Sequence, residues 1–196
     1  MSSTTSNRGY TYPQSTDDFR PYEDIQTLAT NVDADMAAIL AKLNRLGIRL
    51  VQQTGQNLTN NTVTAITYGS GSEAFHFNNG TSWHSTSSNT SRVIPDVAGW
   101  YTCTAHLALA NGATSYTQLV SSIAKNGTRD DPQTVMRPDP GTNGSSAAVI
   151  AEIHCNGSTD YLEHYGMQIS SGTNATNAAA NFRSVFTVKL WRPDTI

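Results

Sequence analysis

The sequence predicts an all-β domain that follows a polar arm and one short α-helix. Charged residues make up only 14% of the 196 residues, against about 25% in an ordinary soluble domain. Ser, Thr, Asn and Gly are abundant, and these residues favour strands and hydrogen-bonded turns over long surface helices. The length allows one well-buried core and no second domain of normal size.

The run 97–109 is the clearest strand in the sequence, and we read Ala98-Gly99 at its start as a break. Its apolar side chains recur at every second position, as in a half-buried strand. The other face carries Thr102, Thr104 and His106. Because small hydroxyls and one histidine replace the charges of a solvated face, we expect another subunit to cover it. The apolar face consists of Tyr101, Cys103, Ala105, Leu107 and Leu109.

Similar runs predict about seven or eight strands in all, the pattern of a sandwich or barrel. Tight turns are expected at Asn126-Gly127 and Asn156-Gly157. The segments 71–89 and 129–146 carry turn residues and predict long exposed loops, with Phe75, Phe77 and Trp83 buried under the first. The strand candidates are 48–52, 63–68, 100–109, 116–125, 147–155, 160–169 and 182–191.

A helix is predicted to begin at Pro21, because Glu23 and Asp24 would favour the positive end of its dipole. Apolar residues then recur with a mean step of 3.5, the period of a coiled-coil seam, and Gly47 would end the helix. The alternative is an amphipathic helix packed on its own domain. We prefer a seam between subunits, since no second helix is expected. The seam consists of Ile25, Leu28, Val32, Met36, Ile39, Leu43 and Leu46.

Residues 1–20 form the arm, whose apolar anchors are Tyr10, Tyr12 and Phe19. Because this segment is so polar, it does not bury enough apolar surface to become ordered alone. We therefore expect a neighbouring subunit or a larger assembly to hold it. The chain is thus divided into an arm (1–20), a trimerising helix (21–47) and a head domain (48–196).

Charge and hydropathy exclude several partners. The net charge is −3, and no Lys/Arg cluster supplies the electrostatic attraction that nucleic-acid binding needs. No segment has the length of a membrane span or the pattern of a secretion signal, so we expect synthesis in a cytoplasm and no membrane insertion. Without a secretion signal, Cys103 and Cys155 are better read as reduced buried residues than as a disulfide.

Catalytic and cofactor motifs are absent, and we expect neither enzymatic activity nor a cofactor. His106 and His154 fall on the non-core phase of their strands, which allows an intersubunit hydrogen bond or a metal site on a three-fold axis. We prefer the hydrogen bond, because neither has a second ligand at suitable spacing. Glu152 and Glu163 are the only carboxylates inside strands, and a structural role at a subunit contact suits them better than catalysis.

Six segments of the chain resemble a known family. The segments AITYGSGSEAF, HSTSSNTSRV, VAGWYTCTAHLAL, IAKNGT, STDYLEHY and FTVKLW, in this order, are similar to the trimeric jelly rolls of the complement-q-head and tumour-necrosis-factor superfamily. The version resembled is the one common on bacteriophage tails and capsids. This resemblance covers roughly residues 48–196 and implies a homotrimeric jelly-roll β-sandwich. We do not carry over the family's calcium sites, because no ligand set matches.

The segment 8–33 is similar to the N-terminal attachment segment of minor tail proteins of phages that infect actinobacteria. Tyr10, Tyr12 and Pro13 carry this resemblance, which implies that the arm, including Phe19, attaches the protein to other virion proteins. The expected function is therefore a virion structural protein, made in the host cytoplasm, whose distal loops either contact a host cell-surface glycan or simply coat the particle. The candidate ligand contacts are Trp83 and Arg137.

Three alternatives remain at this stage. A capsid decoration protein, of the head-fibre or cement type, fits the sequence about as well as a minor tail protein for host attachment. A free complement-q-like recognition module would be expected to carry a signal peptide and a stalk, which are not recognisable here. An enzyme that degrades polysaccharide would need paired carboxylates along a groove.

Overall fold

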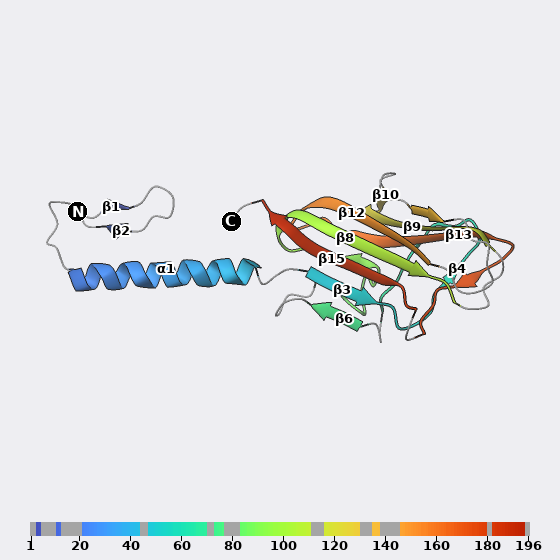
Figure 1. The fold of residues 1–196 in the computed structure, drawn as a ribbon, viewed down its shortest axis with the longest axis horizontal. Coiled ribbons are helices and arrows are strands. Elements are labelled where there is room, and N and C mark those ends of the chain that lie inside the picture. Colours follow the sequence, from blue (N-terminus) through green and yellow to red (C-terminus); the bar gives the residue numbers. More distant parts are fainter. Residues whose placement is uncertain are drawn as a thin grey trace. The chain divides into compact units, whose positions relative to one another are not determined.

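The computed structural model describes ten stretches of the chain, and the chain divides into two compact units, Met1–Asn44 and Arg45–Ile196. We call the second unit the head (Figure 1). None of the described helical residues forms a segment long and apolar enough to cross a membrane. The described residues are 3–4, 11–12, 21–43, 47–69, 73–76, 83–110, 116–129, 135–137, 146–179 and 182–194.

The first unit holds the predicted helix, α1 (Pro21–Leu43). It begins at the expected proline, and Glu23 and Asp24 lie in its first turn, where carboxylates favour the helix dipole. The described helix reaches Leu43, and the predicted stop signal Gly47 is the first residue of β3 (Gly47–Val51). Before the helix, β1 (Ser3–Thr4) and β2 (Thr11–Tyr12) pair antiparallel.

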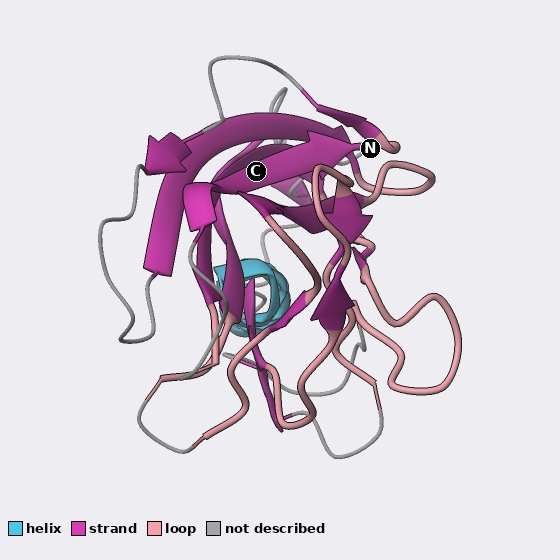
Figure 2. Cartoon of the chain, turned by 90° about the vertical axis from the view of Figure 1, so that its right-hand side faces the viewer, coloured by secondary structure: helices cyan, strands magenta, loops and turns pink. Residues whose placement is uncertain are grey.

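Two antiparallel sheets form the head, and the described regular structure of this unit consists of strands (Figure 2). One has the order β12-β8-β15-β3-β6, and the other has the order β10-β9-β13-β5, with β11 paired to β9 and β7 paired to β13. The strands of the first sheet, besides β3, are β6 (Glu73–His76), β8 (Ala98–Ala108), β12 (Ser146–Asn156) and β15 (Val185–Pro193). Those of the second are β5 (Thr64–Ala65), β7 (Arg92–Val93), β9 (Tyr116–Lys125), β10 (Thr128–Arg129), β11 (Val135–Arg137) and β13 (Leu162–Ser170). A separate pair joins β4 (Asn57–Leu58) to β14 (Asn174–Ala175).

Strand β8 has the alternation that the sequence predicted. Tyr101, Cys103 and Leu107 are fully buried, whereas Thr102, Thr104 and His106 are half-buried. The predicted break at Ala98-Gly99 is wrong, because β8 already begins at Ala98. Gly99 is needed there since a Cβ atom would lie 2.4 Å from the carbonyl oxygen of Arg192 on β15. The glycine thus allows close approach of two strands.

The core lies between the two sheets and joins apolar side chains from both. Tyr101 on β8, Phe186 on β15 and Leu162 on β13 are all fully buried in it. Cys103 and Cys155 are free and buried, which confirms the prediction that they act as small hydrophobic residues. Burial raises the pKa of Cys155 to about 12, so its thiol stays protonated and unreactive at neutral pH.

The turn predicted at Asn126-Gly127 is present, whereas the segments predicted as long loops contain strands. Asn126 and Gly127 both have positive φ, 54° and 77°, as expected for a type I′ hairpin turn between β9 and β10. The predicted loops 71–89 and 129–146 instead contain strands β6 and β11. Of the predicted strand 63–68, only Thr64–Ala65 is a strand. Trp83 is buried as predicted.

Candidate assembly surface

The outward face of the five-stranded sheet can be built from its register. Thr104 on β8 lies directly opposite Ile150 on β12 and Thr187 on β15. Directly paired residues present their side chains on the same face of a sheet. We call the outward face of β12, β8 and β15 the assembly surface. Its described members are Trp100, Thr102, Thr104, His106, Ala148, Ile150, Glu152, His154, Val185, Thr187, Lys189 and Arg192.

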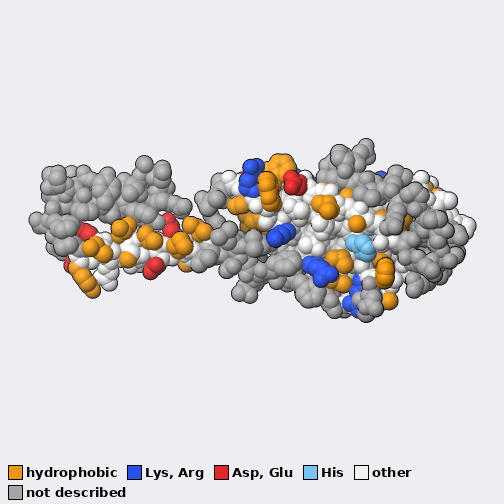
Figure 3. All heavy atoms as spheres, viewed as in Figure 1, with side chains coloured by type: hydrophobic (Ala, Val, Ile, Leu, Met, Phe, Trp, Pro, Cys, Tyr) orange, Lys and Arg blue, Asp and Glu red, His pale blue; other side chains and the backbone are white. Residues whose placement is uncertain are grey.

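The chemistry of the assembly surface is mixed, with a small-residue centre. Ile150 is 70% exposed although it is aliphatic, and Thr104 and Thr187 offer hydroxyls beside it. Glu152 and Lys189 lie on the two sides of Thr102 in one row. On the visible side of the molecule, charged side chains are scattered singly among hydrophobic and uncharged ones (Figure 3). A centre without charged residues, with charges dispersed around it, is typical of a protein–protein interface.

The two histidines on this face already have partners in their own chain. His106 Nδ1 lies 3.3 Å from the Arg183 carbonyl oxygen, at hydrogen-bond distance. His154 Nε2 lies 2.8 Å from Asp194 Oδ2, and its ring packs edge-on against Trp100. One ring nitrogen of each histidine is therefore used within the chain, and the intersubunit hydrogen bond expected of these residues stays a prediction. Within the described part of the chain, no three His, Cys, Asp or Glu side chains group as metal ligands would.

The helix seam is exposed along most of its described length. The exposed fractions are 66% for Ile25, 45% for Leu28, 41% for Val32 and 51% for Met36, and Ile39 is partly buried. Hydrophobic side chains follow α1 on its visible side (Figure 3). Four exposed apolar side chains in register on one helix are costly in water unless another surface covers them. The Leu43 side chain and residue Leu46 lie outside the described part.

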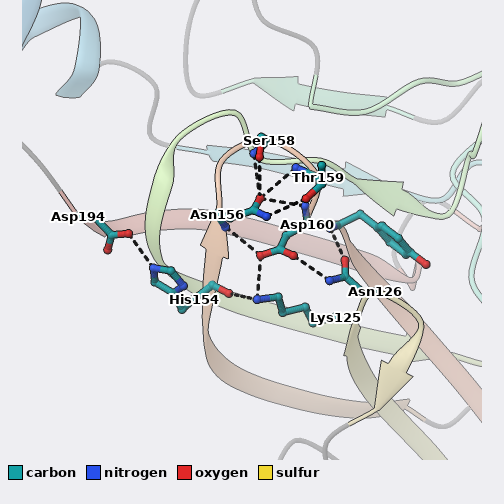
Figure 4. Close-up of polar contacts among 9 residues, drawn as sticks. Lys125, Asn126, His154, Asn156, Ser158, Thr159, Asp160 and Asp194 are labelled. Atoms are coloured by element: carbon teal, nitrogen blue, oxygen red, sulfur yellow. Dashed lines mark hydrogen bonds and ion pairs between the residues drawn. The ribbon is translucent and has the colours of Figure 1, made fainter.

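A polar cluster fastens one end of the head (Figure 4). Lys125 Nζ donates to Asp160 Oδ2 at 2.8 Å and to the carbonyl oxygen of His154 at 2.8 Å. Asn126 and the backbone N–H of Asn156 also donate to Asp160. Burial opposes ionisation of Asp160, but these donors outweigh it and lower the pKa of the carboxyl. The cluster holds the β9–β10 turn against the end of β12. Both carboxylate oxygens of Asp160 accept hydrogen bonds from these donors, so Asp160 has a structural role.

The Asn156 side chain explains the second predicted turn. Its Oδ1 accepts hydrogen bonds from the backbone N–H groups of Ser158, Thr159 and Asp160, the pattern of an Asx turn. Gly157 has a φ of 72°, and a Cβ there would lie 2.3 Å from the backbone nitrogen of Ala98. Asn156-Gly157 is therefore a turn, as predicted, shaped by the side chain rather than by a two-residue hairpin.

A serine and a histidine meet inside the core. Ser121 Oγ lies 3.0 Å from His164 Nε2, and Tyr68 OH lies 2.8 Å from His164 Nδ1. The arrangement resembles a nucleophile and its base, but all three residues are fully buried. Burial, followed by the charge of His106, lowers the pKa of His164 to about 3. The trio satisfies polar groups between the two sheets and offers no access to a substrate.

The predicted ligand contacts are not supported as a site. Trp83 is 5% exposed, and its Nε1 donates to Asp96 Oδ1 at 2.7 Å, so the expectation that its ring stacks on a ligand is wrong. Arg137 lies on β11, where only the backbone is described. For the arm, Tyr12 belongs to β2, and its side chain lies outside the described part, as do Tyr10, Pro13 and Phe19.

Known proteins resemble this chain in fold and not in sequence. No family model matches the chain, and no curated protein matches it in sequence. The crystal structure of murine APRIL at pH 5.0 is 11% identical, with a TM-score of 0.52 over 74% of this chain and 99% of that one. The Eiger TNF of S. frugiperda is 10% identical, with a TM-score of 0.51 over 78% and 98%.

A third match comes from a virus particle. The vertex protein P5 of phage PRD1 is 17% identical, with a TM-score of 0.52 over 76% of this chain and 98% of that one. The head has the tumour-necrosis-factor-like jelly-roll fold. This confirms the expected fold class, and at these identities the likeness concerns the fold alone.

Proposed function

We propose that the chain is a non-enzymatic structural protein of a phage particle that works as a homotrimer. The arm attaches to other virion proteins, α1 joins three chains along its seam, and the jelly-roll head is displayed outward for host attachment. In this proposal the protein is of the minor tail type, and the virion is its location. The likeness of the head to a phage vertex protein supports a virion role.

The exposed seam of α1 is the observation that carries the proposal. Leu28 and Val32 lie on the described helix, and both are more than two-fifths exposed. A seam with a 3.5-residue period is covered by copies of itself in a coiled coil. The assembly surface would add a second contact between the heads, through Ile150 and the hydroxyls of Thr102 and Thr104. Each contact would suit a three-fold arrangement of copies.

A capsid location is the second candidate, and one observation favours it. One phage protein with a similar fold, P5 of PRD1, is a vertex protein, and a capsid decoration protein would need the same anchor, helix and head. The two candidates share every structural element described above and differ only in where the arm attaches.

Immunogold labelling of intact particles tests both. Antibodies against the head should label the tail tip if the protein is of the minor tail type, and capsid vertices or faces if it decorates the capsid. Particles without label, while the protein is abundant in infected cells, would contradict a virion role.

A further inference from the structure

A cluster of tyrosine, arginine and glutamate lies on the outward face of the six-stranded sheet, the side of the sandwich opposite the assembly surface. Arg92 on β7 lies directly across from Glu163 on β13, so both side chains are on the same face. Ser91, Tyr161 and Tyr165 join them through the contacts below. We call these five residues the tyrosine cluster.

Glu163 is the buried centre of the tyrosine cluster. It is 4% exposed, and its carboxylate accepts hydrogen bonds from Ser91 Oγ at 2.8 Å, Arg92 Nε at 3.3 Å and Tyr165 OH at 3.0 Å. Desolvation, followed by the bond to Glu163, raises the pKa of Tyr165 to about 12, so its phenol stays a donor. One carboxylate therefore fixes a hydroxyl, a guanidinium and a phenol in place.

Arg92 is held on a second side by an aromatic ring. Its guanidinium carbon lies 3.9 Å from the ring centroid of Tyr161, and its side chain is 36% exposed. Of the five N–H groups of a guanidinium, only the one on Nε has a partner among the residues that the structure describes. The remaining N–H donors are thus fixed in orientation, partly accessible and unused.

A further polar atom beside the tyrosine cluster has no partner. Ser122 lies directly opposite Tyr165 in the register and is 1% exposed. Its Oγ makes no hydrogen bond within the described stretches. Buried hydroxyls in folded proteins are nearly always hydrogen-bonded, so this unpaired hydroxyl sets the surroundings of Tyr165 apart from an ordinary packed core, although it is too buried to contact a ligand itself.

The electrostatics of the tyrosine cluster decide between an ion and an uncharged ligand. Arg92 and Glu163 neutralise each other, so the cluster has no net charge with which to select an ion. It offers two partly exposed tyrosine rings and several fixed donors instead. Aromatic rings suit the C–H face of a sugar, and fixed donors suit its hydroxyls. A structural ion pair between β7 and β13 would need Arg92 and Glu163 but not the tyrosines beside them.

We propose that the tyrosine cluster is a binding site for a neutral saccharide. This site takes the place of Trp83 as the aromatic contact with a ligand. The role of the site in host attachment rests on the proposed function. The inference adds to that function the class of ligand and the position of the binding site on the head. In a trimer the cluster is present three times, so weak binding at each site adds up on a surface that displays many copies of the sugar.

Saturation-transfer NMR and titration with the full-length protein test the site. The probes are glucose, galactose, mannose and N-acetylglucosamine, each at millimolar concentration, with glucuronic acid for comparison. We expect saturation transfer to at least one neutral sugar. Tyr161→Ala should weaken that binding on the order of tenfold, whereas Tyr161→Phe, which keeps the ring, should retain most of it.

Tyr22→Ala is the matched control, because Tyr22 is a 79% exposed tyrosine on α1, outside the head. Thermal midpoints of all variants confirm that they are folded. Absence of transfer to all four neutral sugars, transfer to glucuronic acid alone, or equal weakening by Tyr22→Ala and Tyr161→Ala would each overturn the inference. A chain that is trimeric and present on the particle, yet binds none of the sugars, would overturn this site and leave the proposed function standing.

Discussion

Helix α1 and strand β8 both carry regularly spaced apolar residues, but only β8 buries them within its own chain. Tyr101, Cys103 and Leu107 on β8 are fully buried, while Leu28 and Val32 on α1 are 45% and 41% exposed. Burying a side chain of this size is worth about 1.5–3 kcal/mol. The head thus buries its own apolar face, whereas the described apolar residues of α1 stay exposed. In the proposed trimer, copies of α1 would cover them.

The largest effect should come from opening a cavity in the core of the head. Phe186 is fully buried and stacks on Tyr68, so Phe186→Ala should lower the free energy of unfolding by about 3–5 kcal/mol in denaturant titrations. Trp191→Ala removes a larger aromatic ring that is 60% exposed and should cost less than about 1 kcal/mol. An equal loss of unfolding free energy in both variants would mean that burial does not determine the cost of truncation at these two positions.

The next effect concerns assembly and not stability of the head. Leu28→Asp would place three carboxylates in one layer of the seam, and we expect it to raise the concentration needed for trimers on the order of a hundredfold. Ala29→Asp adds the same charge at an exposed position beside the seam and should change it little. Sedimentation over a concentration series measures both. If the two variants dissociate alike, the seam is not the interface.

A smaller effect is expected from acid, through His164. The pKa of this histidine is about 3 in the folded head, below the ordinary value near 6.5. The folded state therefore binds the proton less readily, and its stability is complete above pH 6.5 and falls as the pH drops toward 3. Between pH 6.5 and pH 5 the loss should be about 2 kcal/mol. Asp160, whose pKa is lowered, changes the stability only at pH values below this range.

His164→Gln removes the titrating group and serves as the control for the acid effect. Unfolding curves of the variant should lose most of the dependence between pH 6.5 and pH 5 that the unchanged chain shows. A variant that keeps the full dependence would assign it to another group.

The sequence predicted the parts of the fold that depend on local pattern. The alternation in β8, the run 116–125 and the Asn126-Gly127 turn were all confirmed, because side-chain period and positive φ are properties of a few consecutive residues. The role of Gly47 was not predictable. A Cβ at Gly47 would lie 2.2 Å from the carbonyl oxygen of Val188, a contact made across the sheet by a residue far along the chain.

The candidate sites show the same division. The half-buried phase of Thr102, Thr104 and His106 could be predicted from one strand, but the contact of His106 with the carbonyl oxygen of Arg183 could not. Trp83 was predicted to be buried and also proposed as a ligand contact, and only the first holds. The tyrosine cluster was missed because Arg92 and Glu163 are 71 positions apart and meet only through the β7–β13 register. A signal was present in Tyr161, Glu163 and Tyr165, which share one strand phase.

The mass of the full-length chain in solution tests the central claim most directly. Light scattering coupled to size-exclusion chromatography should give about three times the chain mass of 21.1 kDa at micromolar concentration, since the seam of α1 and the assembly surface are both covered in a trimer. A single species with the mass of one chain at that concentration would contradict the account.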